Sequence, residues 1–202
     1  MTLRLVLLLV FTVLTFELRA QKPTLSFFVT SVNPGGGGNL GGLAGADAHC
    51  QKLAGGVGAG TRTWRAYLSA APGGKAVHAR DRIGTGPWFN AKGVQIAASL
   101  DDLFGAANRI SVDNALDERG RRVPLDHHDM LTGSTTDGRL APGPDTTCRN
   151  WTSGDAGSAM VGHHDKAGGP ASWSSNHPTQ GCSLALLRPS MGAGLFYCFA
   201  AN

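Results

Sequence analysis

A cysteine-bearing stretch, LAGADAHCQKLA at residues 43–54, gives the chain its first clear structural element. Apolar or small side chains recur in it at a spacing that places them on one face of an α-helix. These residues are Leu43, Ala46, Cys50 and Leu53. Cys50 is therefore expected to face the protein core, and the two glycines that follow at 55 and 56 predict the end of the helix.

Short strands are expected on both sides of this helix. β-Branched and aromatic residues predict an opening strand over residues 25–31, followed by a turn at Asn33-Pro34 and four glycines. Ser99 stands three residues before Asp102, a pattern typical of the cap of a second, shorter helix. Further strands are predicted at 64–69, at 94–97 and, as an apolar central strand, at 194–200, whereas 87–90 reads as a short irregular piece.

The first twenty residues have the features of a secretory signal peptide. Arg4 precedes an apolar run from Leu5 to Phe16, and the small residue Ala20 stands at the expected cleavage point. The run is too short to cross a bilayer as a helix, and no second apolar run follows. We expect residues 21–202 to form one domain that is secreted, periplasmic or at the cell surface, with no membrane span.

The charge balance excludes one large class of partner. The formal net charge is only +4 at pH 7, whereas a dedicated nucleic-acid-binding domain concentrates Lys and Arg on one face. No nucleic-acid partner is therefore expected. Two short arginine clusters are either a patch for polyanions or scattered solvated residues. They comprise Arg80 and Arg82, and Arg119, Arg121 and Arg122.

Four cysteines suit a domain rich in loops. The chain has 29 glycines and only 16% charged residues, while Trp, Phe and Leu recur along its length, so long ordered loops are expected rather than disorder. An exported, loop-rich domain is typically crosslinked by disulfides. The four cysteines, Cys50, Cys148, Cys182 and Cys198, allow three pairings, and their spacing alone leaves all three open.

Several of these pieces occur in an order that resembles a known fold. They are ADAHCQKLA around Cys50, WRAYLS at 64–69, CRNW at 148–151, Cys182, and LFYCFA around Cys198. Together they resemble the C-type lectin-like fold, specifically its endostatin-like branch. The resemblance implies an α+β domain with a mixed antiparallel sheet, two short helices, long loops and two nested disulfides, Cys50–Cys198 and Cys148–Cys182.

The same resemblance shows which family chemistry is missing. Calcium-dependent sugar-binding members carry Glu-Pro-Asn or Gln-Pro-Asp loops and a Trp-Asn-Asp strand, and neither occurs here. The nearest piece, Asn176-His-Pro178, lacks the carboxylate that a hard cation needs. Residues 21–31 contain no histidine, so the N-terminal zinc site of endostatin is not reproduced either. What remains implied is non-catalytic binding of a carbohydrate or of an extracellular or host matrix protein.

The motif His-His-Asp occurs twice, at 127–129 and at 163–165. Adjacent histidines on a strand point to opposite faces, so only one histidine of each pair can easily reach a common ion. Zinc needs three or four N, S or O ligands on a tetrahedron. A site across the two loops would draw on His128, Asp129, His163, Asp165 and His177. The alternative is that these histidines, with Trp173, only pack and hydrogen-bond the long loops.

A metal-free ligand surface is the other interpretation of this region. Trp151 and Trp173 would offer flat apolar faces to a sugar ring, and nearby polar side chains would bond its hydroxyl groups. Those polar residues are Asn150, Asn176, His177 and Gln180. Trp151 has a competing interpretation as a buried core residue.

No catalytic nucleophile is evident in the sequence. There is no Gly-x-Ser-x-Gly motif, and the cysteines are better explained as crosslinks. The sequence thus favours an exported, non-catalytic, lectin-like binding protein that requires no cofactor. Two alternatives stay open: a zinc-dependent enzyme built on the two His-His-Asp loops, and a structural envelope protein without a small ligand.

Overall fold

The strand that carries Cys198 lies at the centre of the main sheet. In the computed structural model, which describes residues 24–202, β9 (Tyr197–Ala200) pairs antiparallel with β1 (Phe27–Val29) on one side and with β2 (Trp64–Ala66) on the other. Cys198 is in register with Phe28 and with Ala66. The predicted signal peptide lies outside the described residues. None of the helices between residues 24 and 202 has the length and apolarity that crossing a bilayer requires.

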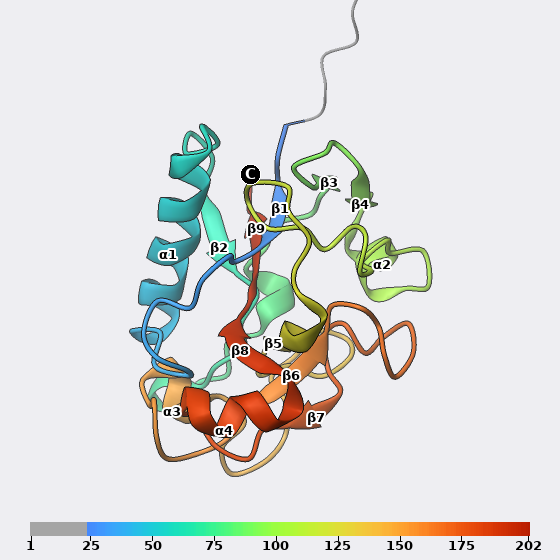
Figure 1. Cartoon of the computed structure of the whole chain (residues 1–202). Coiled ribbons are helices and arrows are strands. Elements are labelled where there is room, and N and C mark those ends of the chain that lie inside the picture. The colour runs from blue at the N-terminus through green and yellow to red at the C-terminus, as the bar shows by residue number, and fades with distance from the viewer. Residues whose placement is uncertain (1–23) are drawn as a thin grey trace, which may run out of the picture.

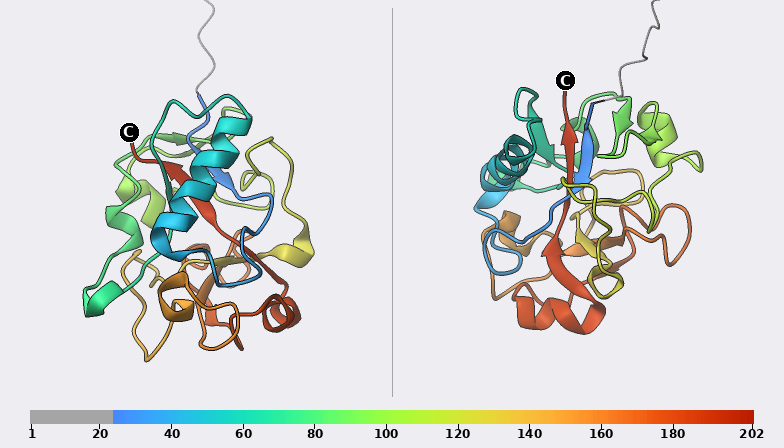
Figure 2. Two further views of the ribbon diagram at one scale, coloured as in Figure 1. Left: turned by 90° about the vertical axis from the view of Figure 1, so that its left-hand side faces the viewer. Right: turned by 45° about the horizontal axis from the view of Figure 1, so that its top comes forward.

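Both faces of this sheet are buried, which explains why its central strand is apolar throughout. Cys198 and Ala200 face a core beneath helix α1 (Gly42–Gly56), which Figures 1 and 2 show lying along the sheet. Tyr197 and Phe199 face a second core. That core is covered by β3 (Trp88–Phe89), β4 (Gln95–Ala97) and α2 (Leu100–Phe104). Successive residues of a strand point to opposite faces, so one apolar run serves two cores.

The final apolar run is divided between two sheets. β8 (Gly192–Leu195) pairs parallel with β5 (Asp129–Leu131) in a four-stranded sheet, ordered β7-β6-β5-β8. The other two strands are β6 (Met160–His163) and β7 (His177–Pro178). The prediction of one strand over 194–200 is therefore wrong. At Phe196 the chain bonds instead to Thr30, whose Oγ1 accepts from the Phe196 N–H at 3.2 Å.

The smaller elements confirm some predictions and correct others. Ser99 caps α2, because its hydroxyl oxygen accepts from the Asp102 N–H at 3.2 Å. The piece predicted to be irregular at 87–90 contains β3, which pairs with β4. The strands predicted at 25–31 and 64–69 are shorter than expected. A further short helix, α4 (Leu184–Leu187), was not predicted.

Both disulfides have the nested pairing that the resemblance implies. Cys50–Cys198 joins α1 to β9 with a Cα–Cα distance of 5.6 Å, and Cys148–Cys182 joins two loops across 5.7 Å. An α+β architecture with few short helices, largely antiparallel sheets and two disulfides is thus confirmed. The prediction of only two short helices is wrong, since α1 has 15 residues and α4 is additional.

The arginine clusters do not form a bare cationic patch. Each of the five arginines lies within 4 Å of a carboxylate. The pairs are Arg80–Asp137, Arg82–Asp47, Arg119–Glu118, Arg121–Asp117 and Arg122–Asp113. Because the positive charges are neutralised locally, the structure gives no support to a polyanion-binding surface at these positions.

Candidate functional site

The segment between β5 and β6 contains a left-handed turn, labelled α3 (Cys148–Trp151). All four of its residues have positive φ, from 46° at Cys148 to 65° at Trp151, and none is a glycine. The left-handed conformation costs an L-residue about 1–2 kcal/mol. Four such residues in sequence persist only where their surroundings impose the conformation, and strain of this kind is concentrated at functional sites.

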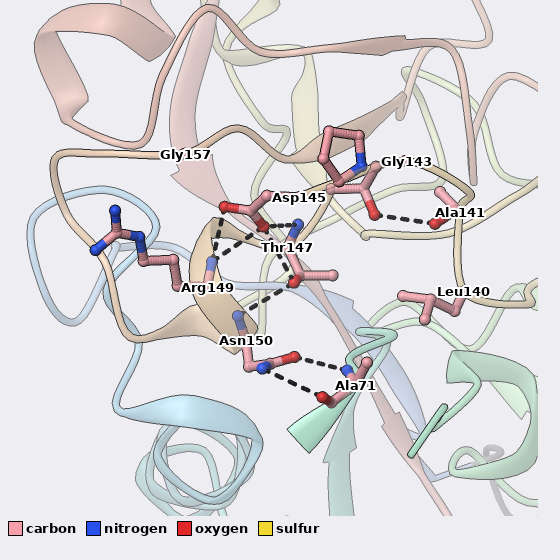
Figure 3. Close-up of a pocket in the computed structure, with 11 residues that line it drawn as sticks. Ala71, Leu140, Ala141, Gly143, Asp145, Thr147, Arg149, Asn150 and Gly157 are labelled. Atoms are coloured by element: carbon pink, nitrogen blue, oxygen red, sulfur yellow. Dashed lines mark hydrogen bonds between the residues drawn. The ribbon is translucent and has the colours of Figure 1, made fainter. Parts of the chain in front are cut away.

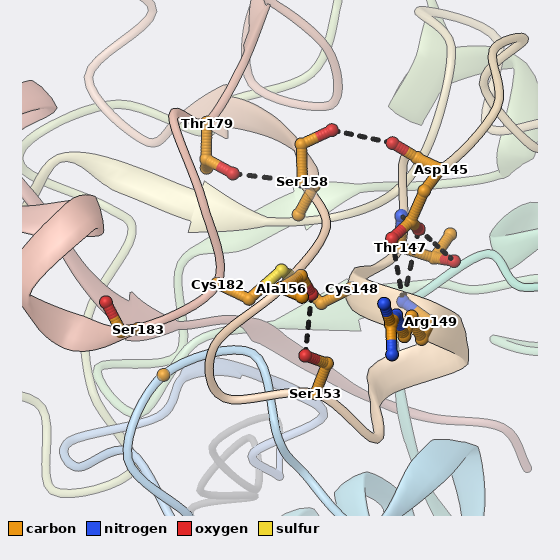
Figure 4. Close-up of a disulfide and its surroundings, with 12 residues drawn as sticks. Asp145, Thr147, Cys148, Arg149, Ser153, Ala156, Ser158, Thr179, Cys182 and Ser183 are labelled. Carbon is orange, nitrogen blue, oxygen red and sulfur yellow. Dashed lines mark hydrogen bonds between the residues drawn. A yellow bond between two sulfur atoms is a disulfide. The ribbon is translucent and has the colours of Figure 1, made fainter.

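Two side chains that precede the turn and one disulfide hold it in place. The Asp145 carboxylate accepts from the backbone N–H groups of Thr147 and Arg149 at 3.0 and 3.1 Å. The Thr147 hydroxyl oxygen accepts from the Asn150 N–H at 3.1 Å. Figure 4 shows the Cys148–Cys182 disulfide between the turn and the segment that leads to α4. The turn is therefore tied at its beginning and to a distant loop.

The run of glycines at 35–38 lets the chain pass close to this disulfide. A Cβ on Gly38 would lie 2.4 Å from the Cys148 Sγ, and a Cβ on Gly37 would lie 2.2 Å from the Cys182 carbonyl oxygen. Both distances are too short for any side chain. The glycine-rich turn predicted after the first strand is thus packed closely against the crosslink.

The turn forms one side of a pocket of about 530 Å³ (Figure 3). Leu140 and Ala141 lie on the opposite side of the pocket from Asp145 and Arg149. Arg149 is exposed at the rim, and its guanidinium makes no hydrogen bond or ion pair with any residue of the range 24–202. The full lining consists of Ala71, Leu140, Ala141, Gly143, Pro144, Asp145, Thr146, Thr147, Arg149, Asn150 and Gly157.

The two tryptophans predicted to stack on a ligand cannot do so. Trp151 and Trp173 are both completely buried. The Trp151 indole N–H donates to the Ser69 carbonyl at 2.8 Å, and Trp173 packs against Tyr67 with their ring centroids 4.9 Å apart. The prediction of two open aromatic faces is therefore wrong, and the competing interpretation of Trp151 as a core residue is correct.

The polar residues predicted to bind a ligand lie in two separate places. Asn150 lines the pocket, but its amide is engaged with Ala71, accepting from that residue's N–H at 2.6 Å. Asn176 is exposed and donates to the Ala167 carbonyl at 3.0 Å. His177 belongs to the histidine cluster described next, and Gln180 is exposed on the loop beyond β7.

The predicted metal ligands converge, and the sheet register explains why. Asp129 on β5 lies directly opposite His163 on β6, and His177 on β7 lies opposite Val161, two residues before His163. Paired residues of neighbouring strands share a face, so the three side chains meet. The Asp129 Oδ1 is 3.2 Å from the Nε2 atoms of His128 and His163 and 3.7 Å from that of His177.

The second nitrogen of each ring in this cluster has a hydrogen-bond acceptor. His128 Nδ1 lies 3.2 Å from the Asp165 carboxylate, His163 Nδ1 is bonded to the Ala167 carbonyl, and His177 Nδ1 lies 3.1 Å from the Pro178 carbonyl. Partial burial acts to raise the pKa of Asp165, but hydrogen bonds from Ala167 and His128 lower it overall. Asp165 is therefore an anionic acceptor behind His128, one step outside the cluster.

The other histidine of each pair has a different environment, although the first pair precedes β5 and is not part of a strand. His164 is fully buried, and burial lowers its pKa to about 4, so its ring is neutral at neutral pH. Neither of its ring nitrogens has a hydrogen-bond partner among the described residues. His127 lies beside other pockets, where it lines the space near Pro124 and Asp126. Only His128 and His163 enter the cluster.

Sequence reasoning missed the residues that shape the pocket. Asp145 and Thr147 were not predicted, although Asp and Thr shortly before a cysteine are residues that often cap turns. Arg149 was not predicted either, because a left-handed turn without glycine has no recognisable sequence signal. A comparison with known protein families finds no family model that matches this chain, and a comparison with curated proteins finds no significant relative.

Proposed function

We propose that this chain is an exported, non-catalytic binding protein of C-type lectin-like, endostatin-type architecture, and that it binds a carbohydrate in the pocket beside the left-handed turn. The observation that carries the proposal is the turn itself. Four consecutive strained residues are held by a disulfide, an aspartate and a threonine at the wall of an open pocket. Strain on this scale supports a binding role better than a packing role.

The pocket also suits a sugar in size and chemistry. Its volume of about 530 Å³ lies in the range of small-molecule sites. Leu140, Ala141 and Pro144 offer apolar surface for one face of a pyranose ring, while Asp145 and Thr147 offer oxygen atoms for its hydroxyl groups. The resemblance implies ligand contacts in the long loops that follow Cys148, and of the lining residues Arg149, Asn150 and Gly157 lie after that cysteine.

The free guanidinium at the rim narrows the class of carbohydrate. Arg149 is exposed and unpaired within the described chain, unlike the seven arginines that contact carboxylates elsewhere. A guanidinium binds a carboxylate or sulfate through two parallel hydrogen bonds. We therefore propose an acidic saccharide, such as one that contains a uronic acid or a sulfated sugar, as the ligand.

Substitution of Arg149 tests this assignment. In Arg149→Ala we expect affinity for acidic glycans on an array, and for the best of them in solution titration, to fall about tenfold or more, because a charge-assisted hydrogen bond is lost. Arg188→Ala is the matched control, since Arg188 is an exposed arginine that lines a different pocket. Binding that is unchanged in Arg149→Ala, or equally reduced in both variants, contradicts the proposal, as does an array without any bound glycan.

A further inference from the structure

We propose that His128, Asp129, His163 and His177 form a zinc site that fastens the edge strand β7 to β6 and β5. This site is separate from the pocket of the proposed function and involves none of its lining residues. Its role also differs from ligand binding, because the metal would stabilise the protein's own fold.

The burial of the Asp129 carboxylate without hydrogen-bond partners is the first reason to infer a bound cation. The Asp129 side chain is 1% exposed, and neither of its oxygen atoms has a hydrogen-bond partner among the described residues. Burying an ionised carboxylate without partners is strongly unfavourable. The groups nearest to Oδ1 are three imidazole nitrogens, so whatever stabilises the carboxylate must lie among them.

The hydrogen bonds of the three rings fix which nitrogen faces inward. Each Nδ1 has an oxygen acceptor, so a neutral ring carries its proton there and leaves the Nε2 lone pair free. The three Nε2 atoms then surround one carboxylate oxygen, at 3.2, 3.2 and 3.7 Å from the Asp129 Oδ1. Four acceptors without a donor repel one another, and a divalent cation between them satisfies all four at once. A carbonyl or carboxylate behind each ligating histidine is also the usual outer support of a metal site.

The distances match tetrahedral coordination. Bonds of about 2.0–2.1 Å to zinc place neighbouring ligand atoms about 3.3 Å apart on a tetrahedron. The Asp129 Oδ1 lies 3.2, 3.2 and 3.7 Å from the three Nε2 atoms. One ligand atom from each of Asp129, His163 and His177 lies within 4.8 Å of the other two, whereas His128 shares such a group with His163 and Asp165.

The donor set selects the type of metal and its role. Three imidazoles and one carboxylate suit zinc, whereas calcium and magnesium require mainly oxygen ligands. With His128, which lies 3.2 Å from the Asp129 Oδ1, as the fourth ligand, the protein completes a tetrahedron and leaves no position for a water nucleophile, which is the arrangement of structural zinc sites. The geometry therefore favours a structural zinc site over the zinc-dependent enzyme that the sequence left open.

Protonation is the competing explanation. A histidine that carries protons on both nitrogens could also donate to Asp129, but the His128 and His163 rings are stacked with centroids 4.3 Å apart. Charging both of them would place two cations in contact. A proton on one ring would satisfy one acceptor only, whereas a metal ion satisfies the whole cluster.

The test is metal binding by the oxidised, chelator-treated protein. Zn²⁺ should bind with a stoichiometry of one in calorimetry, and Co²⁺ should give the intense visible absorption of tetrahedral coordination. His177→Ala is the main variant, because His177 is partly exposed on an edge strand and its removal leaves the core intact. We expect it to weaken binding about 100-fold or more, beyond the loss from an outer-shell change. Asp129→Asn should have a similar effect.

His127→Ala is the matched control. It removes a histidine from the same His-His-Asp motif but from outside the cluster, so its zinc affinity should equal that of the wild type. The proposal is overturned if the wild type binds no zinc, if His127→Ala and His177→Ala lose affinity equally, or if Co²⁺ gives the weak spectrum of octahedral coordination. The proposal is also overturned if NMR of the metal-free protein at neutral pH shows that the histidine rings of the cluster are positively charged, because protons would then stabilise the Asp129 carboxylate without a metal ion.

Discussion

Removal of the Cys50–Cys198 disulfide, in the variant Cys50→Ala/Cys198→Ala, should lower the free energy of unfolding by about 5 kcal/mol. The bridge joins residues 148 positions apart, and a crosslink restricts the unfolded chain more as the loop that it closes grows. Cys148–Cys182 spans only 34 positions, for which the same relation gives about 4 kcal/mol. Urea unfolding of the two double variants under oxidising conditions compares these values.

The structure gives a second reason to expect a greater loss of stability without Cys50–Cys198 than without Cys148–Cys182. Cys148 lies within the left-handed turn, so removing its crosslink allows four strained residues to relax and offsets part of the loss. Cys50 and Cys198 lie instead in a regular helix and a central strand, where no such relief exists. A greater loss in Cys148→Ala/Cys182→Ala than in Cys50→Ala/Cys198→Ala would show that the entropy of the unfolded chain does not govern these bridges.

The sequence predicts elements well where local chemistry determines them. The helical spacing around Cys50 and the cap at Ser99 are local signals, and both elements form, although the first helix continues through Gly55 and Gly56, which were predicted to end it. The disulfide pairing could be obtained only from the resemblance, because the cysteine spacing allows three pairings. The division of 194–200 between two sheets had no signal, since Leu195, Phe196 and Tyr197 are equally apolar and equally buried in either arrangement.

For the candidate sites, too, the sequence predicts what local residue patterns determine and not what depends on tertiary structure. The repeated His-His-Asp motif identified the residue types of the cluster and the alternation of each pair, but their convergence depends on the register between β5, β6 and β7. That register is a tertiary property. The pocket was missed almost completely because its turn lacks glycine. Trp151 and Trp173 were misassigned because an aromatic residue in a loop-rich region can either stack on a ligand or pack in the core.

Asp47→Ala should destabilise the protein by about 3–5 kcal/mol. Both carboxylate oxygens of Asp47 accept from Arg82 Nη2 at 2.8 Å, and one also accepts from the Ala66 N–H at 2.9 Å. The Asp47 and Arg82 side chains are each only 12% exposed. Loss of one partner leaves a buried charge unpaired, which costs far more than the pair contributes. Urea unfolding at neutral pH measures the change.

Two further variants separate this effect from a simple loss of contacts. Arg65 also bonds to Asp47, but it is 44% exposed, so Arg65→Ala should cost no more than about 1 kcal/mol. In Asp47→Ala/Arg82→Met the unpaired charge is absent, and most of the lost stability should return. If the double variant is as unstable as Asp47→Ala, the bond to Ala66 rather than the buried charge carries the effect. Asp47 belongs to the Ala-Asp pair before Cys50, and it ties α1 to β2 beside the disulfide that ties α1 to β9.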